Sequence, residues 1–320
     1  MALREASLWE GLIEDGRPLL LLTAVALLLS GAFAIFLAAR REFLPHDIAY
    51  LGMSADDLCR IAGCRVVRFM FHDRVAFGGA LIAIAVLYSW LVAFPLRGGA
   101  RWAWWALTIS GAFGFASFMA YLGYGYLDTW HGAATVVLLP IFLLGLWRTR
   151  GLGKVRVPGW LRSAQGVAAP AMSRAGRWGL VATGAGMLTA GLVILSVGAT
   201  WVFVAEDLAF MGLTQPMLDQ VNPRLIPLIA HDRAGFGGGL ASAGILVTIC
   251  AWYGSPSRSF YQAMLFAGTA GFGCAIGVHY VEGYTNLVHL GPAIAGAALF
   301  ASSLTLEVVG IRRKGAPERR

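Results

Sequence analysis

The sequence has few charged residues: Asp, Glu, Lys and Arg make up 13% of its 320 residues, about half the share in an ordinary soluble domain. A soluble globule needs a polar exterior, so this scarcity excludes a soluble enzyme, and the 58% apolar content excludes a disordered chain. Four cysteines are too few for a disulfide-rich secreted scaffold. The chain also lacks a phosphate-binding Gly-rich loop, a His-Glu-x-x-His motif and a Gly-x-Ser-x-Gly motif.

Long apolar runs dominate instead, and the mean hydropathy is +0.68. About 20 apolar residues cross a bilayer as a helix, and lipid favours helices because it offers backbone groups no water partner. We therefore expect an all-α, multi-pass membrane protein. The first run is too long for a signal peptide and is expected to be retained. The eight expected spans are Leu19–Ala39, Val75–Phe94, Trp102–Tyr121, Leu127–Trp147, Leu180–Val204, Ala234–Trp252, Tyr261–Val278 and Leu287–Val308.

Basic residues predict the orientation of these spans. The segment 148–177 holds seven Lys or Arg and no acid, which favours a cytoplasmic location by the positive-inside rule. Four expected spans lie on each side of this segment, so both termini would also be cytoplasmic. The expected location of the protein is the plasma membrane. We interpret the basic tail 311–320 as a topology anchor beside the bilayer. Despite the net charge of +8, we expect no nucleic-acid partner, because the chain is so apolar.

The chain contains an internal duplication. The ten residues from His72 to Leu81 return as His231 to Leu240 with seven identities, and Asp47–Met53 returns as Asp207–Leu213. The repeat predicts two tandem four-helix bundles, 1–147 and 178–310, joined by the basic linker 148–177 and followed by the tail 311–320. Four spans per unit give both units the same orientation, a parallel repeat. In each unit a long outer loop follows the first span, with a short surface helix beginning near Ser54 or Thr214.

Four of the six histidines recur at matching places. His72 and His231 stand at the start of the second helix of each unit, and His131 and His289 at the fourth. Facing imidazoles in a four-helix bundle can ligate heme iron from both sides, so a b-type heme is expected. Arg74 and Arg233, two residues after these histidines, would either hold the heme propionates or form an interfacial ion-pair network. Gly79 and Gly238, two helical turns after the histidines, would either border the heme macrocycle or permit close helix packing. The expected cofactor-binding residues are therefore His72, His131, His231, His289, Arg74, Arg233, Gly79 and Gly238.

Three acids are candidates for catalysis. Asp47 and Asp207 repeat in the two outer loops, where they would act as acid/base groups or cap surface helices. Glu282 has Tyr124 as its counterpart, and with His279 it gives the second unit a denser set of titratable groups.

The cysteine pair of the first outer loop, Cys59 and Cys64, allows two interpretations: a thiol relay or inert structural thiols. In a continuous helix a spacing of five lies off one face, so a disulfide would demand distortion. Cys250 and Cys274 lie in spans and are expected to pack as small apolar residues.

This layout resembles heme A synthase, a family with eight helices in two pseudo-equivalent four-helix bundles. The resemblance implies His72 with His131 as one heme-ligand pair, His231 with His289 as the other, and Cys59 and Cys64 as the loop cysteines found in some bacterial members. The family's glutamate three residues before the first ligand is Phe69 here, and its arginine directly after that ligand is Asp73, with arginine one residue further on.

The sequence is compatible with three functions. The first is a membrane oxidoreductase with bis-histidine heme near the outer face, heme-modifying or linked to a quinone. The second is a non-enzymatic subunit or assembly factor of a respiratory-type complex. The third is a parallel-repeat transporter, disfavoured because no ionisable residue is placed in mid-span, where transport sites are expected. A Soret band in the purified protein would separate the first two.

Overall fold

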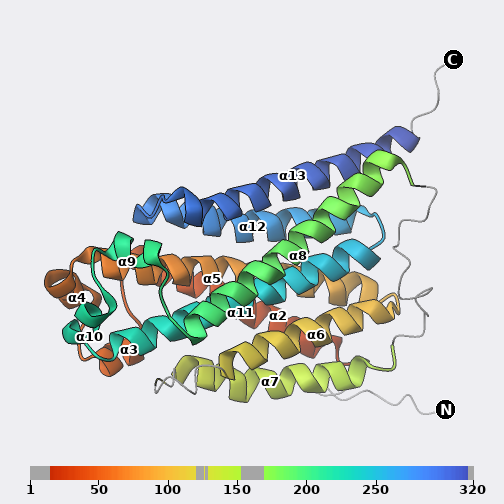
Figure 1. The fold of residues 1–320 in the computed structure, drawn as a ribbon. Helices are drawn as coiled ribbons and strands as arrows, with labels where there is room; N and C mark the ends of the chain where they lie inside the picture. Colours follow the sequence, from red (N-terminus) through yellow and green to blue (C-terminus); the bar gives the residue numbers. More distant parts are fainter. Residues whose placement is uncertain (1–14, 120–125, 127–128, 153–168, 316–320) are drawn as a thin grey trace, which may run out of the picture.

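The computed structural model describes residues 15–119, 126, 129–152 and 169–315. This part of the chain is all-α, with twelve α-helices and no β-sheet (Figure 1). Seven helices are long and apolar enough to cross a membrane, so the chain is a multi-pass membrane protein. These spans are α2 (Arg17–Arg40), α5 (Cys64–Leu91) continued by the π-helical turn Val92–Leu96, α7 (Thr129–Thr149), α8 (Ala171–Ala199), α11 (Leu225–Tyr253), α12 (Arg258–Glu282) and α13 (Leu287–Gly315, apolar to Ile311).

A further long helix, α6 (Arg101–Met119), occupies the place of the expected third span. It is not among the seven, because Trp102, Trp104 and Trp105 lie in its first turns and lower its mean hydropathy. Seven of the eight expected spans are thus confirmed as apolar helices of sufficient length, and the third span stays a prediction.

The two repeats are interlocked. Repeat one contributes α2, α5, α6 and α7, and repeat two contributes α8, α11, α12 and α13. Each second helix packs against the third helix of the other repeat, α5 on α12 and α11 on α6, and α5 also contacts α11. These two helices form the centre: 72% of the most apolar window of each is buried, against 17–28% for the other spans. The expected separate bundles therefore share their central helices.

Glycines bring the first and second helices of each repeat together. A Cβ on Gly237 of α11 would lie 2.4 Å from the backbone nitrogen of Leu195 on α8, and one on Gly78 of α5 would lie 2.8 Å from the carbonyl oxygen of Gly31 on α2. Small residues permit this close approach of helix backbones in membranes. The α8–α11 and α2–α5 pairs are therefore equivalent contacts of the two repeats.

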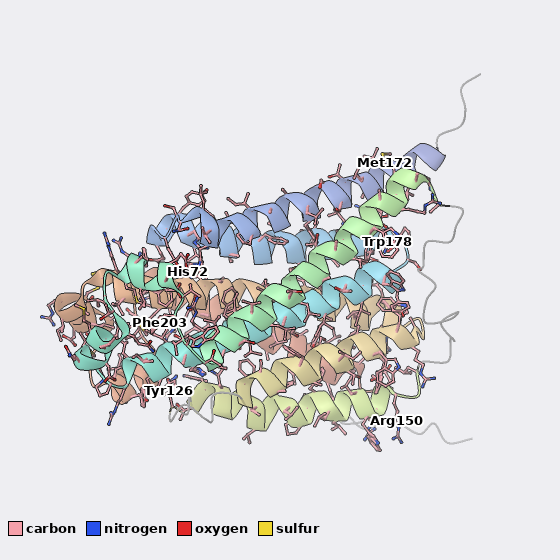
Figure 2. The ribbon with its side chains drawn as sticks, viewed as in Figure 1. His72, Tyr126, Arg150, Met172, Trp178 and Phe203 are labelled. Atoms are coloured by element: carbon pink, nitrogen blue, oxygen red, sulfur yellow. A yellow bond between two sulfur atoms is a disulfide. The ribbon has the colours of Figure 1, made fainter. Side chains whose placement is uncertain are left out.

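Four short helices cover one end of the molecule, here called the loop-helix end; the opposite end is the linker end. They are α3 (Pro45–Leu51), α4 (Ala55–Ala62), α9 (Ala205–Met211) and α10 (Gln215–Val221). Figure 2 shows His72, Tyr126 and Phe203 toward the loop-helix end, and Arg150, Met172 and Trp178 at the linker end. We expected one surface helix per loop, but Gly52 and Gly212, each with φ of 71°, end a first helix in left-handed geometry before a second begins.

Several helices begin earlier than expected. Because α5 starts at Cys64 and α11 at Leu225, His72 and His231 lie about two turns inside their helices rather than at the start. Helix α8 starts at Ala171, within the expected linker 148–177, whose residues 153–168 lie outside the described part. As a result Arg177, counted as a linker cation, is buried in a helix.

The start of α4 is a capping box. The Ser54 hydroxyl accepts a hydrogen bond from the backbone N–H of Asp57, whose carboxylate accepts one from the backbone N–H of Ser54 at 3.0 Å. Hydrogen bonds from Ser54 and from Arg60 lower the pKa of Asp57 to about 2.

We expect Ser54→Ala to raise the pKa of Asp57 toward its ordinary value of 3.8, because the largest cause of the shift is removed. Because the folded-state pKa is depressed, the carboxylate stabilises the helix start above pH 3.8, and this contribution is lost as the pH falls toward 2. NMR titration of the Asp57 carboxyl carbon measures the shift. An unchanged pKa in the variant would contradict this assignment.

Candidate functional site

Three histidines meet near the loop-helix end of repeat two. His72 on α5 has its Nε2 atom 3.1 Å from the Nε2 atom of His279 on α12. The ring centroid of His289 on α13 lies 5.9 Å from that of His72 and 5.7 Å from that of His279. His72 and His279 are buried and His289 is partly buried. The interlocked helices thus bring a repeat-one histidine into a repeat-two cluster, called here the His72 cluster (His72, His279 and His289).

Hydrogen bonds orient two of these imidazoles. Nδ1 of His279 lies 2.6 Å from the backbone carbonyl of Tyr284, which can only accept, so Nδ1 carries the proton and Nε2 is a bare acceptor. Nδ1 of His72 lies 3.0 Å from the carboxylate of Asp73, which likewise favours a proton on Nδ1 and a lone pair on Nε2. Two basic nitrogens therefore face the same point, where a proton or a cation can be held.

Tyr284 closes the cluster toward the loop helices. Its ring is buried and lies 4.7 Å from the ring of His289, stacked against Phe210 of α9. Burial and the neighbouring Asp207 carboxylate raise the pKa of Tyr284 above its ordinary range, so its hydroxyl stays protonated and donates to Asp207 at 2.9 Å. The sequence marks His279 only as part of a dense set of titratable groups, and the contacts of His279 and Tyr284 with His72 come from the fold.

The other two histidines meet across the repeats as well. Nδ1 of His131 on α7 lies 2.9 Å from Nε2 of His231 on α11. The expected pairs, His72 with His131 and His231 with His289, are therefore wrong as contacts. The reason is the exchange of central helices, since α5 carries His72 to repeat two and α11 carries His231 to repeat one.

The residues after the two repeated histidines form a reciprocal ion-pair network. Arg74 binds Asp232 at 2.9 Å and Asp47 at 2.8 Å. Arg233 binds Asp207 and lies 3.5 Å from Asp73. Each arginine thus joins an aspartate of the opposite central helix to one in the outer loop of its own repeat. This is the ion-pair alternative of the sequence analysis, and a role for Arg74 and Arg233 toward heme propionates stays a prediction.

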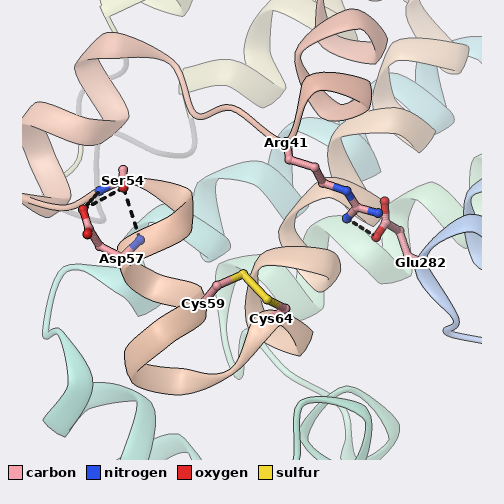
Figure 3. Close-up of a disulfide and its surroundings, with 6 residues drawn as sticks. All are labelled: Arg41, Ser54, Asp57, Cys59, Cys64 and Glu282. Atoms are coloured by element: carbon pink, nitrogen blue, oxygen red, sulfur yellow. Dashed lines mark hydrogen bonds and ion pairs between the residues drawn. A yellow bond between two sulfur atoms is a disulfide. The ribbon is translucent and has the colours of Figure 1, made fainter.

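The acids singled out in the sequence have structural partners. Asp47 and Asp207 accept hydrogen bonds from the backbone N–H groups of Leu44 and Val204 at the starts of α3 and α9, so they cap these helices. Glu282 is buried and pairs with Arg41 (Figure 3). A catalytic role for these three acids stays a prediction.

Cys59 and Cys64 form a disulfide (Figure 3). The segment is not one continuous helix, because α4 ends at Ala62 and α5 begins at Cys64. Gly63 between them has φ of 80°, outside helical geometry, and lets the two Cα atoms approach to 4.2 Å. Cys250 is a free, buried thiol, as expected, and Cys274 is partly buried against Gly79.

A cavity of about 430 Å³ lies beside the His72 cluster, bounded by α5, α8, α11, α12 and α13. We call it the repeat-two cavity. All three histidines of the cluster contribute to its wall, and the remaining lining is apolar apart from Thr183. Many of its side chains are small, including Ala76, Ala80, Ala83, Ala267, Gly268 and Gly271.

The equivalent space in repeat one is only about 90 Å³, and we call it the repeat-one pocket. At three equivalent positions of the two walls, repeat one has the larger side chain. Phe118, Leu138 and Tyr88 of repeat one correspond to Ala275, Gly296 and Val247 of repeat two. Phe118 also stacks on His131, with ring centroids 4.8 Å apart. The duplication thus retains one open chamber and one that side chains have largely filled.

The two glycines expected beside a macrocycle border neither space. A Cβ on Gly79 would lie 2.5 Å from Cβ of Cys274 on α12, and one on Gly238 would lie 2.3 Å from Cβ of Ser117 on α6. They serve the close packing of each central helix on the opposite repeat, the alternative stated for them from the sequence.

Among the described residues, no group of three or more His, Cys, Asp or Glu side chains is arranged to hold a metal ion. A heme needs only two protein ligands, since the porphyrin supplies four nitrogens. No family model, curated protein or solved structure matches the chain.

Proposed function

We propose that this protein is an eight-span membrane heme protein that binds one b-type heme in the repeat-two cavity, with His72 and His289 as axial ligands. The observation that carries the proposal is the His72 cluster at one end of an apolar chamber of about 430 Å³. The imidazole centroids of His72 and His289 lie 5.9 Å apart, and these two residues would hold the heme iron.

Nitrogen–nitrogen distances argue against heme between the two histidine pairs whose ring nitrogens are in direct contact. Trans nitrogens on a metal stand about 4 Å apart, whereas the nitrogens of His131 and His231 are 2.9 Å apart and those of His72 and His279 are 3.1 Å apart. In repeat one, Phe118 also covers a face of His131. The proposal is therefore one heme per chain, where the sequence left one or two hemes open.

Each residue of the site has a distinct role in this proposal. A bound heme would supply one-electron redox chemistry. Asp73 keeps the proton of His72 on Nδ1, which leaves Nε2 to bind iron, and Tyr284 packs on His289 and excludes water from the loop-helix end. His279 is a positioning residue whose ring packs against the His72 ring, with centroids 4.3 Å apart.

The test is the heme content of protein purified from heme-replete cells, measured by pyridine hemochrome and absorption spectra. We expect about one heme per chain with a six-coordinate, low-spin spectrum. His72→Ala and His289→Ala should each abolish that spectrum, because each removes an axial ligand. His131→Ala and His231→Ala are the matched controls and should leave it unchanged.

Two results would count against this function. A colourless wild-type protein would overturn heme binding and favour the non-enzymatic membrane subunit. Loss of the spectrum in His131→Ala, with the spectrum retained in His289→Ala, would place the heme in repeat one.

A further inference from the structure

The repeat-two cavity is elongated. Its wall includes His72 and Leu87 of the same helix, fifteen residues apart, which corresponds to about 22 Å along α5. Among the described residues of its wall, Thr183 is the one other polar side chain. It donates its hydroxyl hydrogen to the carbonyl of Gly179 at 2.8 Å and so offers a ligand little. A ligand in the repeat-two cavity would therefore contact polar atoms at the histidine end and apolar side chains along the rest of its length.

Both ends of this chamber are closed in the described part of the chain. At the loop-helix end, buried Tyr284, stacked under Phe210, and the ion pair of Arg233 with Asp207 stand above the histidines. At the linker end, the wall closes on buried Met264 and Phe300. A large ligand has no path from water through either end without unpacking these groups.

The side of the chamber is open between α8 and α13. These helices touch near the linker end, where a Cβ on Gly176 would lie 2.5 Å from the carbonyl oxygen of Ser303. Helix α8 then crosses away from α13 (Figure 1). Beyond that contact the cavity wall includes exposed residues of both helices, Ala182 and Gly186 on α8 and Ala295 on α13. In a bilayer these residues face the acyl chains.

We propose that the repeat-two cavity takes its ligand sideways from the hydrocarbon layer, through the gap lined by Ala182, Gly186 and Ala295. For the heme of the proposed function, on which this inference rests for the identity of the guest, the source is heme dissolved in the membrane rather than heme offered from water. The gap favours flat or chain-like molecules with a large apolar part, because the residues that line it are small and apolar.

Gly186 provides a sharp test, because a Cβ there would meet no atom within 4 Å. Gly186→Trp should fill the gap while the protein still folds. Gly273→Trp is the matched control: Gly273 is also an exposed helical glycine with open space around it, but it does not line the cavity. Equal melting temperatures of the two variants would establish that both are folded.

The first measurement uses the full-length protein in lipid nanodiscs and a small apolar diazirine dissolved in the lipid. After photolysis, mass spectrometry should find label on buried chamber residues Ala83 and Ala267 in the wild type and in Gly273→Trp, but not in Gly186→Trp. Absence of label from the wild-type chamber, or equal label in Gly186→Trp, would overturn the lateral gap whether or not the protein binds heme.

The second measurement follows the Soret band when heme-free protein in nanodiscs is exposed to hemin in the lipid. Gly186→Trp should slow uptake by about tenfold or more relative to Gly273→Trp, since loading must then wait for a minor open state. Uptake at equal rates overturns the gap as the heme route. No Soret band in any variant, together with chamber labelling, overturns the proposed function and leaves the lateral gap supported.

Discussion

Glu307→Gln should lower the free energy of unfolding by about 3–5 kcal/mol, because it leaves the buried guanidinium of Arg177 without its counter-charge. Arg177 on α8 pairs with Glu307 on α13 and also donates to the carbonyls of Ala251 and Gly254, each at 2.8 Å. Both charged side chains are almost inaccessible, at 3% and 0% exposure. Unfolding by a denaturing detergent, followed by circular dichroism, measures the change.

Glu42→Gln is the control for this prediction. Glu42 pairs with Arg40 at 2.9 Å, but both side chains are about half exposed, and solvent-exposed pairs contribute about 1 kcal/mol or less. A similar small loss for Glu307→Gln would mean that water or lipid headgroups reach the Arg177 pair. That outcome would contradict the buried contact of α8, α11 and α13 at the linker end.

Gly237→Ala should destabilise the protein by about 1–3 kcal/mol, the usual cost of overpacking a close-packed interior. The added methyl group would lie 2.4 Å from the backbone nitrogen of Leu195, so α8 and α11 must move apart. Thermal unfolding of the purified protein measures this loss.

Gly235→Ala is a closely matched comparison, since Gly235 lies in the same helix and a Cβ there would meet no atom within 4 Å. It should be neutral or stabilise by up to about 1 kcal/mol, because alanine has the higher helix propensity. Equal destabilisation by the two variants would mean that α8 does not cross α11 at Gly237.

The sequence predicts the helices of this fold better than it predicts which helices pack against each other. Length and hydropathy identify most of the spans, and the repeat identifies which helices correspond. Neither reveals that α5 packs on α12 of the other repeat, because helices in lipid are apolar on nearly every side and show no single core-facing stripe. The helix starts at Cys64 and Leu225 were missed because the polar residues His72-Asp73-Arg74 and their repeat resembled the end of a span.

The candidate site was only partly predictable, because the repeat identifies its histidines but not how they pair. The duplication singled out His72, His131, His231 and His289, and all four lie in histidine contacts across the repeats. Their pairing depends on the exchange of α5 and α11, which no local spacing encodes. The repeat-two cavity and the repeat-one pocket differ in size because of single residues at equivalent positions, such as Ala275 and Phe118. The sequence alone does not show that these positions line a cavity.

The exchange of central helices also sets the order of events during biosynthesis. Helix α5 is made early, but its partner α12 ends at Glu282 and is therefore made much later. At about 5–20 residues per second, the ribosome needs on the order of ten seconds to make the second repeat. Throughout that interval His72 and Asp73 lack their final neighbours, His279 and Arg233, so the His72 cluster forms only after the second repeat is made.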